Sequence, residues 1–220
     1  PVAVARPAST AEVAAVVRAC AEEGVPVVPQ GGNTSLADGA VPHTPGRELV
    51  LSLARLNRVR DIDPVDLSMV VEAGVPLQAA QEAAAAADCL LPLSISSEGS
   101  ALIGGVLATN AGGNNTVRWG NARDLVLGLE VVLPDGQVWN GLRRLRKDNT
   151  GYCLRQLFVG SEGTLGVITA AVLKLAPRAR ERAVAFCAVA SAEAALELYR
   201  RLRAWDPAAI NAYEYVTGLC

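Results

Sequence analysis

Residues 29–42 read PQGGNTSLADGAVP and directly follow the apolar run GVPVV. Gly31 and Gly32 can adopt positive φ angles without steric cost, so consecutive backbone N–H groups can turn inward as an anion-binding nest. An amide and two hydroxyl side chains come next and can donate further hydrogen bonds. The stretch is a candidate site for a phosphate or pyrophosphate, although an isolated Gly-Gly-Asn is more often a plain surface turn.

The composition excludes several classes of protein. The chain has 220 residues, 51% of them apolar, which is enough for one large domain or two small ones with a packed core. A net charge of −2, from 20 basic and 22 acidic residues, argues against a nucleic-acid partner. The longest apolar tract, AAAAADCLLPL, is interrupted by Asp88 and Pro92. It is too short for a membrane span, so we expect a soluble protein.

The cysteines and the single histidine predict no metal site and no disulfide framework. The cysteines are widely scattered and form no C-x-x-C pair, and only His43 could join them as a metal ligand. Such a set is typical of thiols in a reducing compartment. The first residues, PVAVARPAST, lack the features of a secretory signal, so we expect a cytoplasmic location.

The first 74 residues read as a small α/β unit. Ser9 and Glu12 form an S-x-x-E capping box that begins an amphipathic helix, and Gly24 ends it. Three strands are expected at VPVVP, ELVLSL and SMVVEAG, and the polar segment NRVRDIDPVD is expected to separate the last two. The prediction is a three-stranded unit with one covering helix.

The next hundred residues predict a larger, antiparallel unit. A helix is expected from about Pro76 to Ala87, because the segment opens with proline and is rich in alanine. LVLGLEVVLPDGQVW predicts a hairpin around Pro134, Asp135 and Gly136, and GVITAAVLKLAP predicts another strand.

The polar run PRARER, from residue 177 to 182, predicts a boundary. Beyond it we expect a strand at AVAFCAV, a helix from about Ser191 to Ala204 and a strand at INAYEYV. This β-α-β start is not completed, so the chain is expected to be a fragment of a longer protein.

Two further segments are rich in glycine. SSEGSALIGGVLATNAGG, residues 96–113, interleaves glycines with large apolar residues, so it should pack as a wall against a flat ligand rather than form a floppy loop. KDNTGYCLRQLFVGSEGTLGVIT, residues 147–169, places Glu162 in a region that reads as buried. This carboxylate either bonds to its own turn or contacts a nucleotide. Neither a P-loop nor a G-x-G-x-x-G dinucleotide turn is present.

Six segments, PVVPQGGNTSL, IGGVLATNAGG, RWG, LEVVLPDG, KDNTGY and GSEGTLGVIT, resemble a known family in order and spacing. This is the FAD-binding domain of the vanillyl-alcohol oxidase or PCMH-type superfamily. The resemblance covers about residues 1–177 and is strongest to D-lactate dehydrogenases, glycolate oxidase flavin subunits and D-2-hydroxyglutarate dehydrogenases. It implies an α+β fold of two α/β subdomains, about 1–74 and 75–177, with FAD between them. Residues 183–220 would begin an α+β cap domain.

The resemblance also implies which residues bind FAD. The pyrophosphate would be held by Pro29, Gln30, Gly31, Gly32, Asn33, Thr34, Ser35 and Leu36. The flavin ring and ribityl chain would contact Gly99, Ser100, Ile103, Gly104, Gly105, Ala108, Thr109, Asn110, Gly112 and Gly113. Pro92 and Trp119 are also assigned to the cofactor site, Trp119 either as a lid over the flavin or as an apolar plug. The ribose and adenine would contact Glu162, Gly163, Gly166, Val167 and Ile168. Ser94 and Trp119 depart from the aspartate and tyrosine usual in relatives, which weakens any substrate assignment.

The implied reaction is hydride transfer from a 2-hydroxy acid, of the D-lactate, glycolate or D-2-hydroxyglutarate type, to FAD. Electrons would pass to a separate acceptor: a quinone, a cytochrome or an electron-transfer flavoprotein. FAD should be non-covalent, because His43 is not at the family's attachment position and no cysteine lies between Cys89 and Cys153. The alternatives are another flavin oxidase of the superfamily, of the alditol type, or a non-catalytic electron-transfer subunit. No catalytic residue is assigned, and a homodimer is left open.

Overall fold

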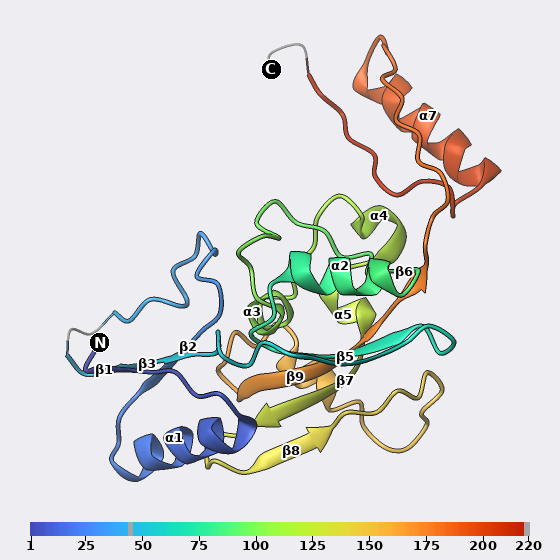
Figure 1. Cartoon of the computed structure of the whole chain (residues 1–220). Coiled ribbons are helices and arrows are strands. Elements are labelled where there is room, and N and C mark those ends of the chain that lie inside the picture. The colour runs from blue at the N-terminus through green and yellow to red at the C-terminus, as the bar shows by residue number, and fades with distance from the viewer. Residues whose placement is uncertain (44–45, 218–220) are drawn as a thin grey trace.

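The computed structural model describes residues 1–43 and 46–217. Figure 1 shows a layered body of sheets and helices, from which a long arm carries the last helix away. Most of the strands lie in a parallel sheet of three strands and an antiparallel sheet of five. This mixed architecture confirms the predicted α+β class.

The smaller sheet is parallel and has the order β1-β3-β2. Its strands are β1 (Ala3–Ala5), β3 (Leu49–Ser52) and β2 (Val27–Gln30). The third member is therefore the first strand of the chain, and the predicted assignment of SMVVEAG to this sheet is wrong. β1 and β2 run parallel on either side of β3, and the helix between them in the chain forms the crossover that carries the chain from one to the other.

That helix, α1 (Thr10–Glu22), begins as the sequence predicts. The Ser9 Oγ accepts a hydrogen bond of 3.2 Å from the Glu12 N–H. In return the Glu12 carboxylate accepts one of 2.7 Å from the N–H of Ala8. The first bond satisfies a backbone donor that the first helical turn leaves free, and the second fixes the residue before the N-cap.

The larger sheet is antiparallel and has the order β4-β5-β9-β7-β8. Its strands are β4 (Val59–Asp63), β5 (Ser68–Glu72), β9 (Val167–Lys174), β7 (Val126–Val132) and β8 (Val138–Gly141). The hairpin prediction is confirmed, with Gly136 at a φ of 78° in the turn between β7 and β8. The polar segment predicted as a separator is strand β4; as an edge strand it can keep polar side chains in solvent.

The pairing of β4 and β5 also bears on the subdomain boundary expected near residue 74. Both strands precede that residue, yet they belong to the larger sheet, so the chain changes sheet between β3 and β4. The division of the domain into residues 1–74 and 75–177 stays a proposal.

Helices cover one face of the larger sheet. They are α2 (Leu77–Ala86), α3 (Ile103–Ala108), α5 (Ala122–Leu125) and α6 (Arg155–Phe158), each of which buries residues in the core there. Between α3 and α5 lies α4 (Thr116–Trp119), which buries no residue, and the short strands β6 (Cys89–Leu90) and β10 (Ala176–Pro177) pair with each other. The glycine-rich segment read as a loop thus contains α3. It is helical despite two glycines because Ile103, Val106 and Leu107 share one face and are buried in the core.

Two hydrophobic clusters hold these layers together. The larger one lies between the five-stranded sheet and the helices α2, α3 and α5. Figure 1 shows these helices on one side of the sheet. The smaller one joins α1 to both sheets through Val13, Val17 and Leu51. Since the smaller cluster also includes Val132 and Val167 of the larger sheet, residues of both sheets pack together in it.

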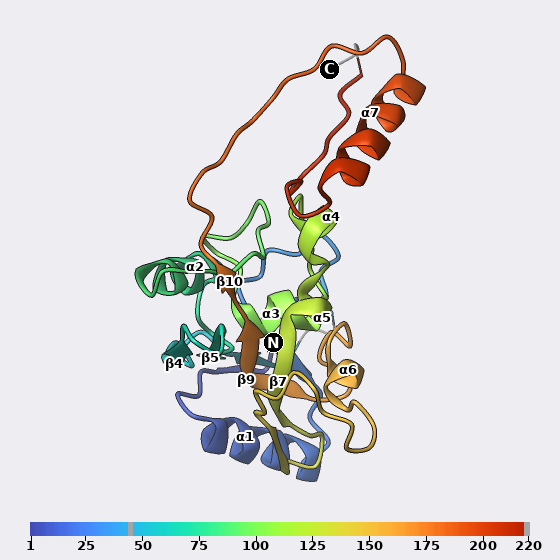
Figure 2. The same cartoon turned by 90° about the vertical axis from the view of Figure 1, so that its right-hand side faces the viewer.

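The chain beyond β10 forms the arm. Residues 178–190 carry no helix or strand, and α7 (Ala192–Trp205) follows with Ser191 as its N-cap. The predicted helix is confirmed, but the predicted strands at 183–189 and 210–216 are absent from the described residues. Neither segment joins a sheet among the described residues. Figure 2 shows the arm set apart from the sheets. No helix within residues 1–43 and 46–217 is long and apolar enough to cross a membrane.

Candidate cofactor-binding site

Three segments that are far apart in the sequence meet around one cleft with a volume of about 260 Å³. They are the loop after β2, the helix α3 and the loop that leads into β9. Of the predicted residues, those that line the cleft are Pro29, Gln30, Gly31, Gly32, Asn33, Thr34, Ser35, Gly104, Gly105, Ala108, Thr109, Glu162, Gly163, Gly166, Val167 and Ile168. All three predicted glycine-rich segments therefore contribute to the same cavity.

The loop after β2 presents backbone donors. The N–H groups of residues 31–35 make no hydrogen bond to any residue that the structure describes. The loop is closed from within, because the Gln30 side-chain amide donates to the Ala40 carbonyl at 2.8 Å. Asn33 has a φ of 52°, which turns the backbone as an anion-binding nest requires. The Gln30 side chain thus stabilises the loop, and the groups left to donate to a ligand are the main-chain N–H groups of residues 31–35.

This loop contacts the second glycine-rich segment through bare backbone. A Cβ atom at Gly31 would lie 3.4 Å from the Cα of Gly105, and one at Gly32 would overlap the carbonyl of Ser100. On the other side of α3, a Cβ at Gly104 would lie 2.8 Å from that of Ala73. The glycines therefore permit the close approach of main chains that forms the cleft.

The third segment is attached to the end of α3. The N–H of Gly160 donates to the Leu107 carbonyl at 3.1 Å, and the N–H of Glu162 donates to the Ala108 carbonyl at 3.0 Å. Across the cleft, a Cβ at Gly163 would lie 2.9 Å from the Cγ of Pro29. The loop before β9 is thus held between α3 and the strand end of β2.

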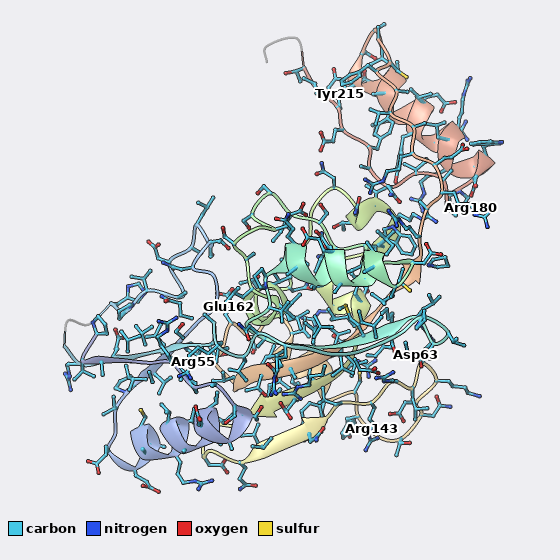
Figure 3. All side chains as sticks on the ribbon, in the orientation of Figure 1. Arg55, Asp63, Arg143, Glu162, Arg180 and Tyr215 are labelled. Atoms are coloured by element: carbon cyan, nitrogen blue, oxygen red, sulfur yellow. The ribbon has the colours of Figure 1, made fainter. Side chains whose placement is uncertain are left out.

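Glu162 is not buried, contrary to the sequence-based expectation. It is exposed on the cleft wall, with a φ of 51°, and in Figure 3 it lies between α3 and the end of the smaller sheet. A carboxylate in contact with water needs no internal partner. Among the described residues that line the cleft it is the only charged one. A phosphate held here would therefore depend on main-chain N–H dipoles rather than on a cation.

The other predicted contacts lie elsewhere in the structure. Leu36 is fully exposed to solvent, and Ile103 faces the core rather than the cleft. Gly99 and Ser100 are exposed beside α3. Their direct contact with FAD stays a prediction that the cleft does not support.

Several predicted polar or small residues have structural roles instead. The Pro92 carbonyl accepts a hydrogen bond from the Asn115 side chain at 2.8 Å, and the Asn110 carboxamide oxygen accepts one from the N–H of Arg123 at 2.9 Å. A Cβ atom would overlap neighbouring oxygen atoms at both Gly112 and Gly113. These residues shape the turns around α3 and α4.

Trp119 is directed toward the C-terminal arm. Its indole N–H donates to the Asn211 side-chain oxygen at 3.2 Å. The same oxygen accepts a bond of 3.3 Å from Arg118, whose guanidinium carbon lies 4.4 Å from the Trp119 ring centroid. This pair links α4 to the arm, and it does not line the cleft.

Residues that the sequence did not single out complete the cleft lining. They are Gly39, Ala40, Leu53, Ile95, Ser97, Ala101, Leu102, Val106 and Ala111. All but Leu53 and Ile95 lie within the quoted segments 29–42 and 96–113, so the segments were recognised although these residues were not named as FAD contacts. Leu53 and Ile95 carry no local signal, because only the packing of distant segments brings them to the cavity.

The donor set fits a dinucleotide cofactor: a run of free N–H groups for phosphate, a glycine surface for close approach and apolar walls. A family model described as FAD binding domain matches residues 1–141. The chain belongs to this FAD-binding domain family. FAD is therefore the cofactor of the domain, and the family resemblance drawn from the six motifs is confirmed.

Known proteins of this family resemble the chain over most of its length. A mitochondrial D-2-hydroxyglutarate dehydrogenase of Bos taurus is 43% identical over 215 residues, which are 98% of this chain and 39% of the bovine protein. A D-2-hydroxyglutarate dehydrogenase of Xanthomonas citri is 41% identical over 217 residues, 99% of this chain and 45% of that protein. The chain thus spans about two fifths of these relatives. The cytoplasmic location stays a prediction, since the bovine protein is named as mitochondrial.

A solved structure shows the same fold. Alkyldihydroxyacetonephosphate synthase superposes with a TM-score of 0.69 at 26% sequence identity, over 79% of this chain and 31% of that one. The FAD-binding domain described above is therefore of the PCMH type, as the motifs predicted.

Proposed function

We propose that this chain is the FAD-binding part of an oxidoreductase that oxidises a 2-hydroxy acid to the 2-oxo acid. The observation that carries the proposal is the cleft built from the three glycine-rich segments. It lies in a chain 43% identical to a protein named D-2-hydroxyglutarate dehydrogenase. A separate electron acceptor would reoxidise the flavin. Because the chain spans about two fifths of such relatives, the activity belongs to the longer protein.

The residues of the cleft would divide the work of holding FAD. The free N–H groups of residues 31–35 would bind the pyrophosphate, and the bare backbone of Gly105 would lie against the flavin end of the cofactor. The Glu162 carboxylate could accept hydrogen bonds from ribose hydroxyls. Leu53, Ile95 and other apolar side chains would exclude water. When bound, FAD supplies the acceptor of the two-electron oxidation.

The groups that handle the substrate are not found in the cleft. Removing hydride from a 2-hydroxy acid needs a cation for the carboxylate and a base for the hydroxyl proton. Glu162 is the only titratable residue among the described lining. Lys147 is exposed and does not line the cleft, and the Arg118 side chain donates a hydrogen bond to Asn211 of the arm. We therefore propose that residues beyond β10, in a cap domain that begins near residue 183, complete the active site.

FAD is expected to be bound without a covalent link. No histidine or cysteine belongs to the described cleft lining, and His43 is exposed in the loop that follows. Acid precipitation of the purified protein should therefore release the yellow flavin into the supernatant. Flavin that remains in the washed pellet would contradict this and would require a covalent attachment residue.

Substrate class is tested by anaerobic bleaching of the flavin in the full-length protein. We expect a D-2-hydroxy acid to bleach the flavin absorbance within the time of mixing, and the matching L-enantiomer to do so far more slowly. Bleaching by alditols instead would identify another oxidase of the superfamily. Bleaching by dithionite but by none of these compounds would favour the non-catalytic electron-transfer subunit.

A further inference from the structure

One arginine lies behind the cleft, on the side away from the cavity, and joins its walls. Arg123 belongs to α5, whose neighbours Ala122 and Leu125 are buried in the core and fix the direction of the helix. Its own N–H donates to the Asn110 side chain at the end of α3. The backbone of α5 is also tied there, because the Ala122 N–H donates to the Ala111 carbonyl at 2.9 Å.

The guanidinium of Arg123 reaches the third glycine-rich segment. It donates to the backbone carbonyl of Gln156 at 2.9 Å, to the side-chain oxygen of the same residue at 2.8 Å, and to the Val159 carbonyl. Those are the residues that lead into Gly160, where a Cβ would lie 2.9 Å from the guanidinium nitrogen. In the described residues Arg123 has no carboxylate partner. Its guanidinium group therefore donates to carbonyl oxygens and to no carboxylate among the described residues.

The segment that Arg123 contacts needs external support. Gly160, Glu162 and Gly163 have φ angles of 82°, 51° and 80°, a conformation that a free chain would not hold. One side of this turn is fixed by the bonds from Gly160 and Glu162 to the end of α3. The charge-assisted bonds from Arg123 fix the other side, at the two carbonyls that precede it.

We propose that Arg123 is a positioning residue of the flavin site. It sets the distance between α3 and the turn of residues 160–163, so that Glu162 and Gly163 reach the part of FAD opposite the flavin ring. This proposal rests on the assignment of those residues to the adenosine half of the cofactor in the proposed function. A point charge cannot replace the guanidinium, because two separate carbonyls must be reached at once.

The test compares two arginines in the full-length protein. Arg123→Met removes the guanidinium behind the cleft. Arg146→Met is the matched control, because Arg146 likewise forms no ion pair among the described residues and donates to two backbone carbonyls, those of Asp66 and Leu67, which do not line the cleft. The dissociation constants of FAD and of FMN, which lacks the adenosine half, are measured by fluorescence on apoprotein. The visible circular dichroism of bound flavin is recorded for each variant.

We expect Arg123→Met to weaken FAD binding about fivefold and FMN binding by less than twofold, which lowers the preference for FAD. Arg123→Lys should recover only part of the loss, and Arg146→Met should leave both constants unchanged. Equal weakening of FAD and FMN, or an equal effect of Arg146→Met, would overturn the proposal. The binding measurements need no substrate. They can therefore contradict the role of Arg123 without contradicting the oxidation of a 2-hydroxy acid, and a failed substrate test leaves them unaffected.

Discussion

Gly105→Val is expected to weaken FAD binding about 10- to 100-fold while the apoprotein keeps its fold. A Cβ at Gly105 would meet only the Cα of Gly31, at 3.9 Å, so the helix itself has room for a side chain. The branched methyl groups would instead project into the cleft that Gly105 lines. Overpacking of this kind costs about 1–3 kcal/mol, and 1.4 kcal/mol corresponds to about tenfold in affinity.

A valine in the same segment but outside the cleft provides the control for Gly105→Val. Gly99 does not line the cavity, and a Cβ there would meet only the flexible end of Gln78, at 3.2 Å. We expect Gly99→Val to bind FAD with less than a twofold change. Titration of both apoproteins with FAD measures the difference, and thermal unfolding checks that each is folded. Unchanged affinity in Gly105→Val would place the cofactor elsewhere, and a large loss in Gly99→Val would restore Gly99 as a contact.

Glu72→Gln is expected to lower the free energy of unfolding at pH 7 by about 2 kcal/mol. Glu72 is 1% exposed and accepts hydrogen bonds from the Arg58 N–H at 3.0 Å and from the Arg58 and Arg60 side chains. An amide would place donors against these donors. The loss of unfolding free energy should be smaller than for a fully buried ion pair, because the Arg58 side chain is 72% exposed and water screens its charge.

The same carboxylate should make stability depend on pH. Burial raises the pKa of Glu72, but the hydrogen bonds from Arg58 and Arg60, together with the charge of Arg60, outweigh it and hold that pKa below the ordinary 4.5. A lowered folded-state pKa adds stability above pH 4.5, and this stability is lost as the pH falls through the folded-state value. The difference between wild type and Glu72→Gln should therefore shrink in urea titrations below pH 4.5.

Glu197→Gln is the matched control for the acid dependence. Glu197 also pairs with two arginines, Arg200 and Arg201, which lower its pKa to about 2. Its pair is exposed on α7, so its removal should leave the urea midpoint almost unchanged. A stability difference for Glu72→Gln that persists unchanged to pH 3 would show that the amide disturbs packing rather than an ionic network.

Glu72 is connected through its chain neighbour to the helix that lines the cleft. The next residue, Ala73, accepts a hydrogen bond of 2.7 Å from the Gly104 N–H and packs directly against that glycine. The ionic network continues from Arg60 to Glu130, which also accepts bonds from Thr10 of α1 and Thr169 of β9. This hydrogen-bonded network thus connects α1 to the larger sheet, on which α3 packs.

Local signals in the sequence were sufficient for most of the backbone. The capping pair at Ser9 and Glu12, the turn at Gly136 and the alanine-rich helix α2 each depend on neighbours within a few residues, and each appears where it was predicted. The three glycine-rich segments were also recognised as one site. Their glycines specify where main chain can approach main chain or ligand, and that property is local.

Which side of each segment faces the cleft was decided by tertiary structure alone. Ile103 and Gly105 are two residues apart in one motif, yet Ile103 is buried in the larger hydrophobic cluster and Gly105 lines the cleft. Glu162 is exposed because a cavity opens beside it, and β4 is a strand because β5 offers it free backbone groups. Burial and pairing depend on partners far along the chain. The sequence by itself therefore determined which segments form the cleft, and packing between the sheets and α3 decided which of their atoms line it.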